Sequence, residues 1–396
     1  MKPRTTGLKR ITFVITTTWG TLYGRPHQMA SLFKQDGYEI SVIDLGFVLA
    51  RIREKLARTN MYESQLSIAD RRYSFTYAVP RRIARRIKFH PRFDKESLSR
   101  FLFKLVGKAF TDDSIIWVQG ISLLYDPKTF EDLPNSLFIS DIEDDYKYFY
   151  KQQFQAQIQQ IESEMARNAD LVFATSQPLY ERLITLNSKT HLIPNGVDEN
   201  FIQVAEGKLH KPADMPDGIV IGFEGAIANW LDFDLLYTLA EAIGNAKIVL
   251  VGKLLVSLDR ELFKKLTSLS NVVYLGEKPY HELPTYISYF DVGIIPFSIS
   301  SLTKAVHPNK LYEYLSCGIP VVSTMLPEIA RYAREGVLEV ADDTDSFISA
   351  TRKMIACRRD SILVTQRVSI ARDNTWRSRY QKIKDLIQNE LKIKGI

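Results

Sequence analysis

A cation and a carboxylate stand three residues apart in the segment 307–320, HPNKLYEYLSCGIP. Pro308 is typical of a helix start, and residues 318–320, Gly-Ile-Pro, would end that helix and open a buried strand. Lys310 and Glu313 would then share one face of the first helical turns. An ammonium there can neutralise a diphosphate, and a carboxylate can accept hydrogen bonds from a ribose diol. A surface ion pair is the alternative explanation of this spacing.

An acidic cluster follows the apolar run 137–139, with Asp141 as its first member and Glu143, Asp144 and Asp145 after it. A carboxylate at a strand end can accept a proton from a hydroxyl or balance a developing positive charge. The same residues could instead cap a helix that we expect over 146–167. Both roles are compatible if Asp144 or Asp145 is the cap and Asp141 is the functional group.

A glycine-containing loop, TTTWGTLYGR over residues 16–25, follows the first strand-like run. Gly20 and Gly24 would allow the backbone to approach an anion closely, and Arg25 would start the next helix. The loop lacks the GxGxxG order of a dinucleotide site, which disfavours an NAD enzyme. A tight strand-to-helix turn explains the same glycines.

Metal and cofactor signatures are weak in this sequence. Asp232 and Asp234 have Asp-x-Asp spacing, but we expect them inside a helix over 230–242, where residues two apart point to different sides. The six histidines show no zinc spacing, and there is no Ser-His-Asp or Walker pattern. Cys317 and Cys357 suit neither a disulfide framework nor a cysteine zinc site. We therefore expect no metal and no cofactor.

Strand-like runs alternate with amphipathic helical patterns along the 396 residues, which predicts two α/β lobes with parallel sheets covered by helices. The weakly patterned segment 206–218 predicts a linker. We expect domains over 1–205 and 206–375 and a C-terminal helix over 376–396. Two Rossmann-like lobes would face each other across a central cleft, with ligands at the carboxyl ends of the strands. The expected strands are 11–16, 39–44, 114–118, 136–140, 171–174 and 191–193, then 219–223, 247–251, 272–275, 292–295, 320–323 and 337–340.

Positive charge is concentrated in residues 51–110, which hold sixteen Lys and Arg against five Asp and Glu, a net +11 in a chain of net +6. As a helix, its densest part would align Ile83 and Ile87 beside arginines, an arrangement suited to anionic lipid; a charged surface helix is the alternative. No nucleic-acid module accompanies the charge, and no run of about 18 apolar residues is present. We expect a cytoplasmic protein, peripheral at the inner face of the membrane. The arginines concerned are Arg81, Arg82, Arg85 and Arg86.

The string HPNKLYEYLSCGIPVVST resembles the donor-site signature of the GT-B glycosyltransferases, specifically the glycosyltransferase family 4-like group. Further strings resemble one bacterial branch of that group, of polysaccharide or teichuronic-acid type, in chain order. They are WGTLYGRPHQMA, SDIEDDY, NADLVFATSQPLYERL, LIPNGVDENF, FEGAIANWLDFDLL and ELPTYISYFDVGIIPF, and they cover most of the chain outside residues 50–113. The resemblance implies a GT-B fold whose C-terminal helix crosses back to the first lobe.

The resemblance also implies roles for individual residues. Glu313 would bind the donor ribose, Lys310 and Lys304 would meet the diphosphate, and Asp141 would lie near the reacting carbon. Gly225 would lie against the donor, and Gly20 and Gly24 would approach its phosphate from the first lobe. The other expected donor contacts are Lys253, Lys278, Pro279, His307 and Asn309, with residues 277–279 holding the base mainly through backbone groups. Expected acceptor contacts are Arg25 and Asp144.

Two departures from the family pattern concern the donor site. Ala305 stands eight positions before Glu313, so the first glutamate of the Glu-x7-Glu motif is absent. The Arg and Lys pair that usually follows the first strand of the second lobe is replaced by residues 224–230, with Lys253 as the nearest basic residue.

The resemblance implies a metal-independent, retaining enzyme that moves a hexose-type sugar from a nucleotide-sugar donor, UDP-linked in our expectation, to a saccharide or lipid-linked acceptor. Because one motif glutamate is missing, a non-catalytic nucleotide-sugar binding protein is an alternative. A nucleotide-sugar epimerase of the same fold is another.

Overall fold

The computed structural model describes residues 8–15, 23–44, 61–68, 71–78, 113–121, 133–207 and 210–396. The chain forms two compact units: unit 1 comprises Met1–Ile193 and Tyr380–Ile396, and unit 2 comprises Pro194–Arg379. The division lies earlier than the expected boundary after residue 205, because helix α8 (Glu199–Glu206) packs against helices of unit 2. The expected linker 206–218 therefore belongs to unit 2.

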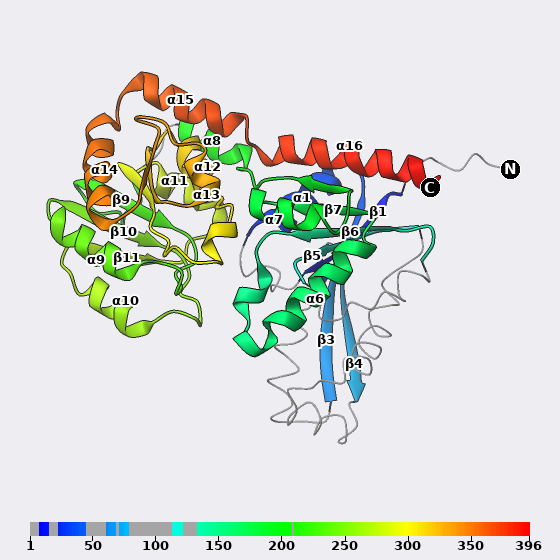
Figure 1. Cartoon of the computed structure of the whole chain (residues 1–396). Helices are drawn as coiled ribbons and strands as arrows, with labels where there is room; N and C mark the ends of the chain where they lie inside the picture. Colours follow the sequence, from blue (N-terminus) through cyan, green and yellow to red (C-terminus); the bar gives the residue numbers. More distant parts are fainter. Residues whose placement is uncertain are drawn as a thin grey trace. The chain divides into compact units, whose positions relative to one another are not determined.

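Unit 1 is built on an eight-stranded sheet in the order β4-β3-β2-β1-β5-β6-β7-β8 (Figure 1). Strands β2, β1, β5, β6, β7 and β8 are parallel, as predicted. An antiparallel hairpin, β3 (Met61–Ile68) and β4 (Arg71–Ala78), extends the sheet and was not predicted. The parallel strands are β1 (Arg10–Ile15), β2 (Glu39–Asp44), β5 (Ile115–Gln119), β6 (Leu137–Ile142), β7 (Leu171–Ala174) and β8 (Thr190–Leu192).

The helix expected over 146–167 is interrupted. A 3-10 turn, η1 (Tyr146–Phe149), comes first, and α6 (Gln152–Asn168) begins only after Tyr150 and Lys151 have adopted extended backbone. Lys151 is the N-cap of α6, so neither acidic residue expected to cap this helix does so. Asp145 precedes η1, but its side chain makes no capping hydrogen bond. Among the described residues, the other unit 1 helices are α1 (Arg25–Gln35), α7 (Gln177–Ile184) and most of α16 (Trp376–Lys394).

Helix α16 packs on unit 1, as the predicted return of the C-terminal helix requires (Figure 1). The Tyr380 ring meets the Phe33 ring edge-on at 4.7 Å between centroids. At the far end of the helix, Lys394 Nζ lies 2.8 Å from Asp170 Oδ1. Ile383 and Ile387 are fully buried between these points, so an apolar stripe anchors the helix along its length.

Unit 2 is built on a six-stranded sheet in the order β11-β10-β9-β12-β13-β14, and every neighbouring pair is parallel. The strands are β9 (Ile219–Glu224), β10 (Ala246–Val251), β11 (Val272–Gly276), β12 (Val292–Ile295), β13 (Val321–Thr324) and β14 (Leu338–Ala341). The helices are α8, α9 (Phe233–Ala242), α10 (Arg260–Thr267), α11 (Leu283–Ile287), α12 (Lys310–Ser316), α13 (Pro327–Ala330), α14 (Thr344–Cys357) and α15 (Ser361–Arg372), with 3-10 turns η2 (Tyr280–Glu282) and η3 (Thr303–Ala305). None of the helices that the structure describes in either unit is both long and apolar enough to cross a bilayer.

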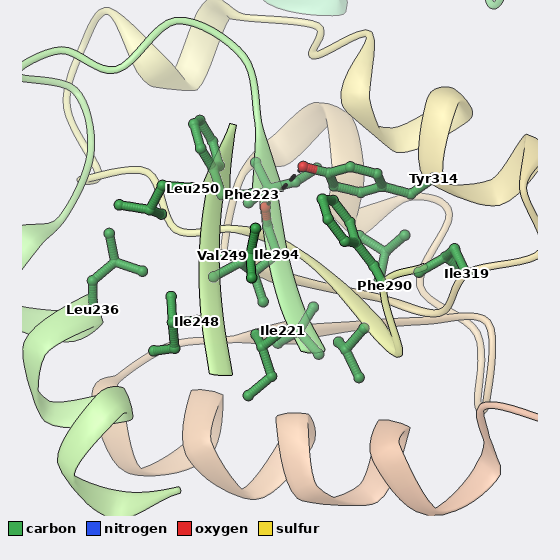
Figure 2. Close-up of a cluster of buried hydrophobic side chains, with 14 of the residues drawn as sticks. Ile221, Phe223, Leu236, Ile248, Val249, Leu250, Phe290, Ile294, Tyr314 and Ile319 are labelled. Carbon is green, nitrogen blue, oxygen red and sulfur yellow. Dashed lines mark hydrogen bonds between the residues drawn. The ribbon is translucent and has the colours of Figure 1, made fainter. Parts of the chain in front are cut away.

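The core of unit 2 brings the centre of the sheet close to helix α12. Figure 2 shows Tyr314 beside Phe290 and Ile294, and the Tyr314 and Phe290 ring centroids are 6.2 Å apart. A Cβ at Gly293 would collide with the Tyr314 ring, so glycine in β12 permits this approach. Tyr314 Oη accepts a hydrogen bond from the backbone N–H of Glu224 at 2.9 Å. The end of strand β9 is thereby fixed against helix α12.

The Asp-x-Asp string lies at a helix start. Helix α9 begins at Phe233, so Asp232 is outside it, contrary to the expected helix over 230–242. The Asp232 carboxylate accepts a hydrogen bond from the backbone N–H of Leu235 at 2.9 Å. Asp232 is therefore an N-cap, which explains its residue type without a ligand.

Candidate functional site

Three glycine turns lie at the carboxyl ends of β9, β10 and β11. Gly225, Gly252 and Gly276 have φ values of +126°, +145° and +77°, in the region that favours glycine. The N–H of Gly225 donates to Val251 O and that of Gly252 donates to Gly276 O, each at 2.8 Å. A Cβ at Gly252 would collide with the Gly225 backbone. These turns therefore form one compact backbone surface at the ligand-binding edge of the sheet.

Lys310 lies against this surface. Its Nζ is 5.4 Å from the centroid of the Phe223 ring and 5.9 Å from that of Phe297, within cation–π range. A Cβ at Gly225 would collide with Lys310 Cε and Nζ. The structure thus brings together Lys310 and Gly225, which the sequence predicted for the same ligand.

Glu313 lies on the same helix and meets a second carboxyl group that sequence reasoning missed. Glu313 and Glu224 are 7% and 8% exposed, and their carboxyl groups are close enough to share a hydrogen bond. Burial raises the pKa of Glu313 well above its ordinary value, the negative charge of Glu224 raises it further, and Lys310 lowers it. Glu313 therefore retains a proton more readily than an isolated glutamate does. In the sequence, residue 224 belongs to the segment 224–230 that replaces two basic residues of the family pattern, and no motif marks its carboxyl group.

The remaining donor-site predictions from helix α12 and the loop before it fall in different environments. His307 is buried with its ring 5.6 Å from the Tyr312 ring, and its carbonyl accepts a hydrogen bond from Asn195 Nδ2 at 2.9 Å. Asn309 immediately precedes α12, and its side chain makes no capping hydrogen bond. Lys304 lies exposed on η3, next to the buried Ala305.

Two other predicted donor contacts carry ion pairs. Lys278 Nζ lies 2.6 Å from Asp214 Oδ2 and 4.9 Å from the centroid of the Tyr286 ring. This ammonium is therefore already neutralised, which leaves the backbone of Lys278 and Pro279 for the predicted base contact. Lys253 Nζ lies 4.0 Å from Glu277 Oε2, at the limit of an ion pair.

A second polar cluster lies at the carboxyl ends of β5 and β6 in unit 1. Arg25, at the start of α1, and Asp141, in β6, are each 1% exposed, and Arg25 Nε lies 2.8 Å from Asp141 Oδ2. Trp117 Nε1 donates to the same oxygen at 3.0 Å, and Arg25 Nη1 donates to the carbonyl of Ile193 at 2.9 Å. Asp141 and Arg25, predicted to contact different groups, are thus partners of each other.

Three acidic or phenolic neighbours of Asp141 hold their protons more tightly than usual. Burial and then the charge of Asp141 raise the pKa of Glu143, whose carboxylate accepts a hydrogen bond from Gln119 Nε2. Burial and then the charge of Asp145 raise the pKa of Asp144 to about 6. Burial raises the pKa of Tyr146 as well, and its ring fills the space that a Cβ at Gly120 would need.

The remaining predictions are only partly covered by the described residues. Gly24 is described, but a Cβ there would meet no atom within 4 Å, so no close contact explains the glycine. Gly20 lies outside the described residues, as do Arg81, Arg82, Arg85 and Arg86. In the parts of the chain that are described, no group of three or more His, Cys, Asp or Glu side chains is arranged to hold a metal ion.

Comparison with known proteins matches part of the chain to glycosyltransferases. Residues 218–357 match the model described as "Glycosyl transferases group 1". Over 233 residues the chain is 30% identical to the "Putative teichuronic acid biosynthesis glycosyltransferase TuaH" of Bacillus subtilis (strain 168). That alignment covers 57% of this chain and 58% of TuaH, so it spans less than two thirds of the relative.

Solved structures show the same fold over almost the whole chain. A glycosyltransferase from Rickettsia africae ESF-5 has a TM-score of 0.64 at 13% identity, covering 97% of this chain and 99% of that chain. Anabaena HepE in complex with UDP has a TM-score of 0.57 at 15% identity, covering 96% of this chain and 100% of that chain. Identities this low concern the fold alone. The chain therefore has the GT-B fold predicted from its sequence, and residues 218–357, within its second unit, match the model of the group 1 glycosyltransferases.

Proposed function

We propose that this protein is a glycosyltransferase that moves a hexose-type sugar from a UDP-linked donor to a saccharide or lipid-linked acceptor. The proposal rests on the contact between the Lys310 ammonium and the Gly225 turn, at the carboxyl edge of the unit 2 sheet. Glu313 lies on the same helix as Lys310. The names of two similar proteins support the proposal. HepE has been crystallised with UDP and with UDP and glucose, and TuaH is named for teichuronic acid biosynthesis.

The donor would bind in unit 2. Lys310 would neutralise charge on the diphosphate, which increases as the bond to the sugar breaks, and Glu313 would accept hydrogen bonds from the ribose. Because this stabilisation comes from fixed groups of the protein, the proposal assigns no step to a metal ion. Transfer with retention of configuration is part of the proposal and rests on the family resemblance.

The acceptor would bind in unit 1. Asp144 would accept a hydrogen bond from an acceptor hydroxyl, and Arg25 would hold Asp141 in place through their ion pair. The Asp141 carboxylate would balance positive charge that develops at the reacting carbon. A cytoplasmic location and contact of Arg81, Arg82, Arg85 and Arg86 with anionic lipid complete the proposal, and both rest on the sequence.

A thermal-shift screen of nucleotides and nucleotide sugars tests donor binding, because a ligand bound only by the folded state raises the melting temperature. We expect UDP and a UDP-sugar to raise it and AMP to leave it unchanged. If no nucleotide or nucleotide sugar raises it, the proposal fails.

Turnover then separates the enzyme from its alternatives. We expect UDP release from the UDP-sugar, slow with water and faster with a saccharide acceptor. Binding without transfer or hydrolysis would instead support a non-catalytic binding protein. Formation of an isomeric UDP-sugar would support an epimerase.

A further inference from the structure

The donor site of unit 2 contains buried hydrogen-bond acceptors that lack donors. Oε2 of Glu224 and Oδ1 of Asn309 are inaccessible to solvent, and neither accepts a hydrogen bond from any described residue. Glu224 is only 8% exposed, so it is 92% buried. Leaving such atoms unpaired costs free energy, which a ligand that brings hydrogen-bond donors would recover.

The carboxyl groups of Glu224 and Glu313 are positioned by two elements that meet. Glu313 lies in the first turn of helix α12, and Asn309 is the N-cap of that helix. Glu224 ends strand β9, where its N–H donates to Tyr314 Oη and its carboxyl group meets that of Glu313. The two carboxyl groups therefore lie near Lys310, whose ammonium packs against Gly225, the residue after Glu224.

This grouping selects one ligand chemistry. A diphosphate at neutral pH offers only acceptors, so it suits Lys310 and not a pair of carboxyl groups. Hydroxyl groups on neighbouring ring carbons offer several donors at once and suit the carboxyl pair. A nucleotide sugar carries both kinds of group, in its diphosphate and in its rings.

We propose that Glu224 is a specificity-determining residue of the donor site, whose carboxylate accepts hydrogen bonds from ring hydroxyls of the nucleotide sugar. The inference rests on the proposed function, because it concerns the same donor. The hydroxyls belong either to the ribose or to the transferred sugar, and both present the same chemistry. Ala305, which stands in place of the first motif glutamate, supplies no polar atom, so Glu224 provides a carboxylate from a different element.

Isothermal titration of UDP, 2′-deoxy-UDP and UDP-glucose against wild type, Glu224→Ala and Glu224→Gln tests the proposal. A hydrogen bond to a charged group contributes enough that its loss weakens binding by about tenfold or more. We expect Glu224→Ala to weaken the binding of UDP-glucose by that factor. Glu224→Gln should weaken it less, since the amide oxygen still accepts a hydrogen bond. Glu241→Ala, at an exposed position on helix α9, is the matched control and should bind like wild type.

The nucleotide series identifies the hydroxyls. If they belong to the transferred sugar, UDP binds Glu224→Ala as tightly as wild type. If they belong to the ribose, Glu224→Ala weakens the binding of UDP as much as that of UDP-glucose. The binding of 2′-deoxy-UDP, which keeps only the 3′-hydroxyl of the ribose diol, then weakens less. Either pattern supports the inference.

Unchanged affinities for all three ligands in both Glu224 variants would overturn the inference and leave the proposed function standing. Failure of the wild type to bind any of them would overturn the proposed function itself. Glu224→Gln preserves the side-chain shape, so the test remains decisive if Glu224→Ala fails to fold.

Discussion

Arg25 and Asp141 lie 116 residues apart in the chain and form a buried ion pair, with Arg25 Nε 2.8 Å from Asp141 Oδ2. The pair ties the start of α1 to β6, and Trp117 donates to the same carboxylate oxygen from the strand between β1 and β6. Any role of Asp141 in catalysis therefore depends on a residue that also stabilises unit 1.

Arg25→Met should lower the free energy of unfolding by about 3–5 kcal/mol, because it leaves the Asp141 charge buried without a cation. Urea denaturation measures this. The control is Arg10→Met, which removes an exposed ion pair with Glu39 and should cost less than about 1 kcal/mol. Equal losses in the two variants would contradict a buried, stabilising pair.

Lys310→Ala should weaken UDP binding by about tenfold or more, because it removes a charge-assisted contact to the diphosphate. Titration calorimetry at two salt concentrations measures this. Affinity of the wild type should fall more steeply with salt than that of the variant. Lys264→Ala, exposed on α10, should match the wild type. Unchanged UDP affinity in Lys310→Ala would remove Lys310 from the donor site.

Gly225→Ala should reduce both stability and UDP affinity. At φ +126° a Cβ is strained, at a cost of about 1–3 kcal/mol, and it would push Lys310 away from the turn. Chemical denaturation and UDP titration measure the two effects. Gly244→Ala, where a Cβ meets nothing within 4 Å, is the matched control. If Gly225→Ala were as stable as this control and bound UDP normally, the turn would not position Lys310.

Asp144 should give acceptor-dependent turnover an acidic limit. Its pKa is raised to about 6, so it gains a proton as the pH falls through that value and ceases to act as a charged acceptor. We expect kcat/KM for the acceptor to fall below pH 6 in the wild type and to lose this dependence in Asp144→Asn. Asp145→Asn removes a charge that raises the pKa of Asp144, so the fall in kcat/KM should move to lower pH. If kcat/KM still falls below pH 6 in Asp144→Asn, another group causes the fall.

The carboxyl pair in unit 2 should make stability depend on pH. Three groups act on Glu313 besides its burial: Glu224 raises its pKa through its charge and a shared hydrogen bond, Lys310 lowers it, and Asp198 raises it. The folded pKa is raised above the ordinary 4.5, so this contribution is fully present below that value and is lost as the pH rises through the folded pKa.

Glu224→Gln should therefore be more stable than the wild type at pH 8, with a smaller difference at pH 5, because it removes a charge that opposes ionisation of Glu313. Urea unfolding at both pH values measures this. Glu241→Gln should show no such pH-dependent gain. A variant less stable than the wild type at pH 8 would show that the two carboxyl groups do not repel each other.

The chain's fold class followed from local sequence patterns. The predicted ranges 39–44, 171–174 and 292–295 coincide with β2, β7 and β12, because a strand buried on both faces is a short apolar run between turns. The start of α12 just after Pro308 was predicted from another local signal, the preference of proline for helix starts. These signals lie within a few consecutive residues and need no knowledge of distant parts of the chain.

The tertiary structure decided which polar groups meet. Asp141 has Arg25 as its partner, Lys278 has Asp214, and Glu313 has Glu224, and each pair joins different elements. The break between η1 and α6 at Tyr150 also depends on residues far away in the sequence. The ring of Tyr146, the first residue of η1, packs against Gly120. Charge pairing and pKa depend on distances of a few ångströms across the fold, and spacing along the chain does not contain those distances.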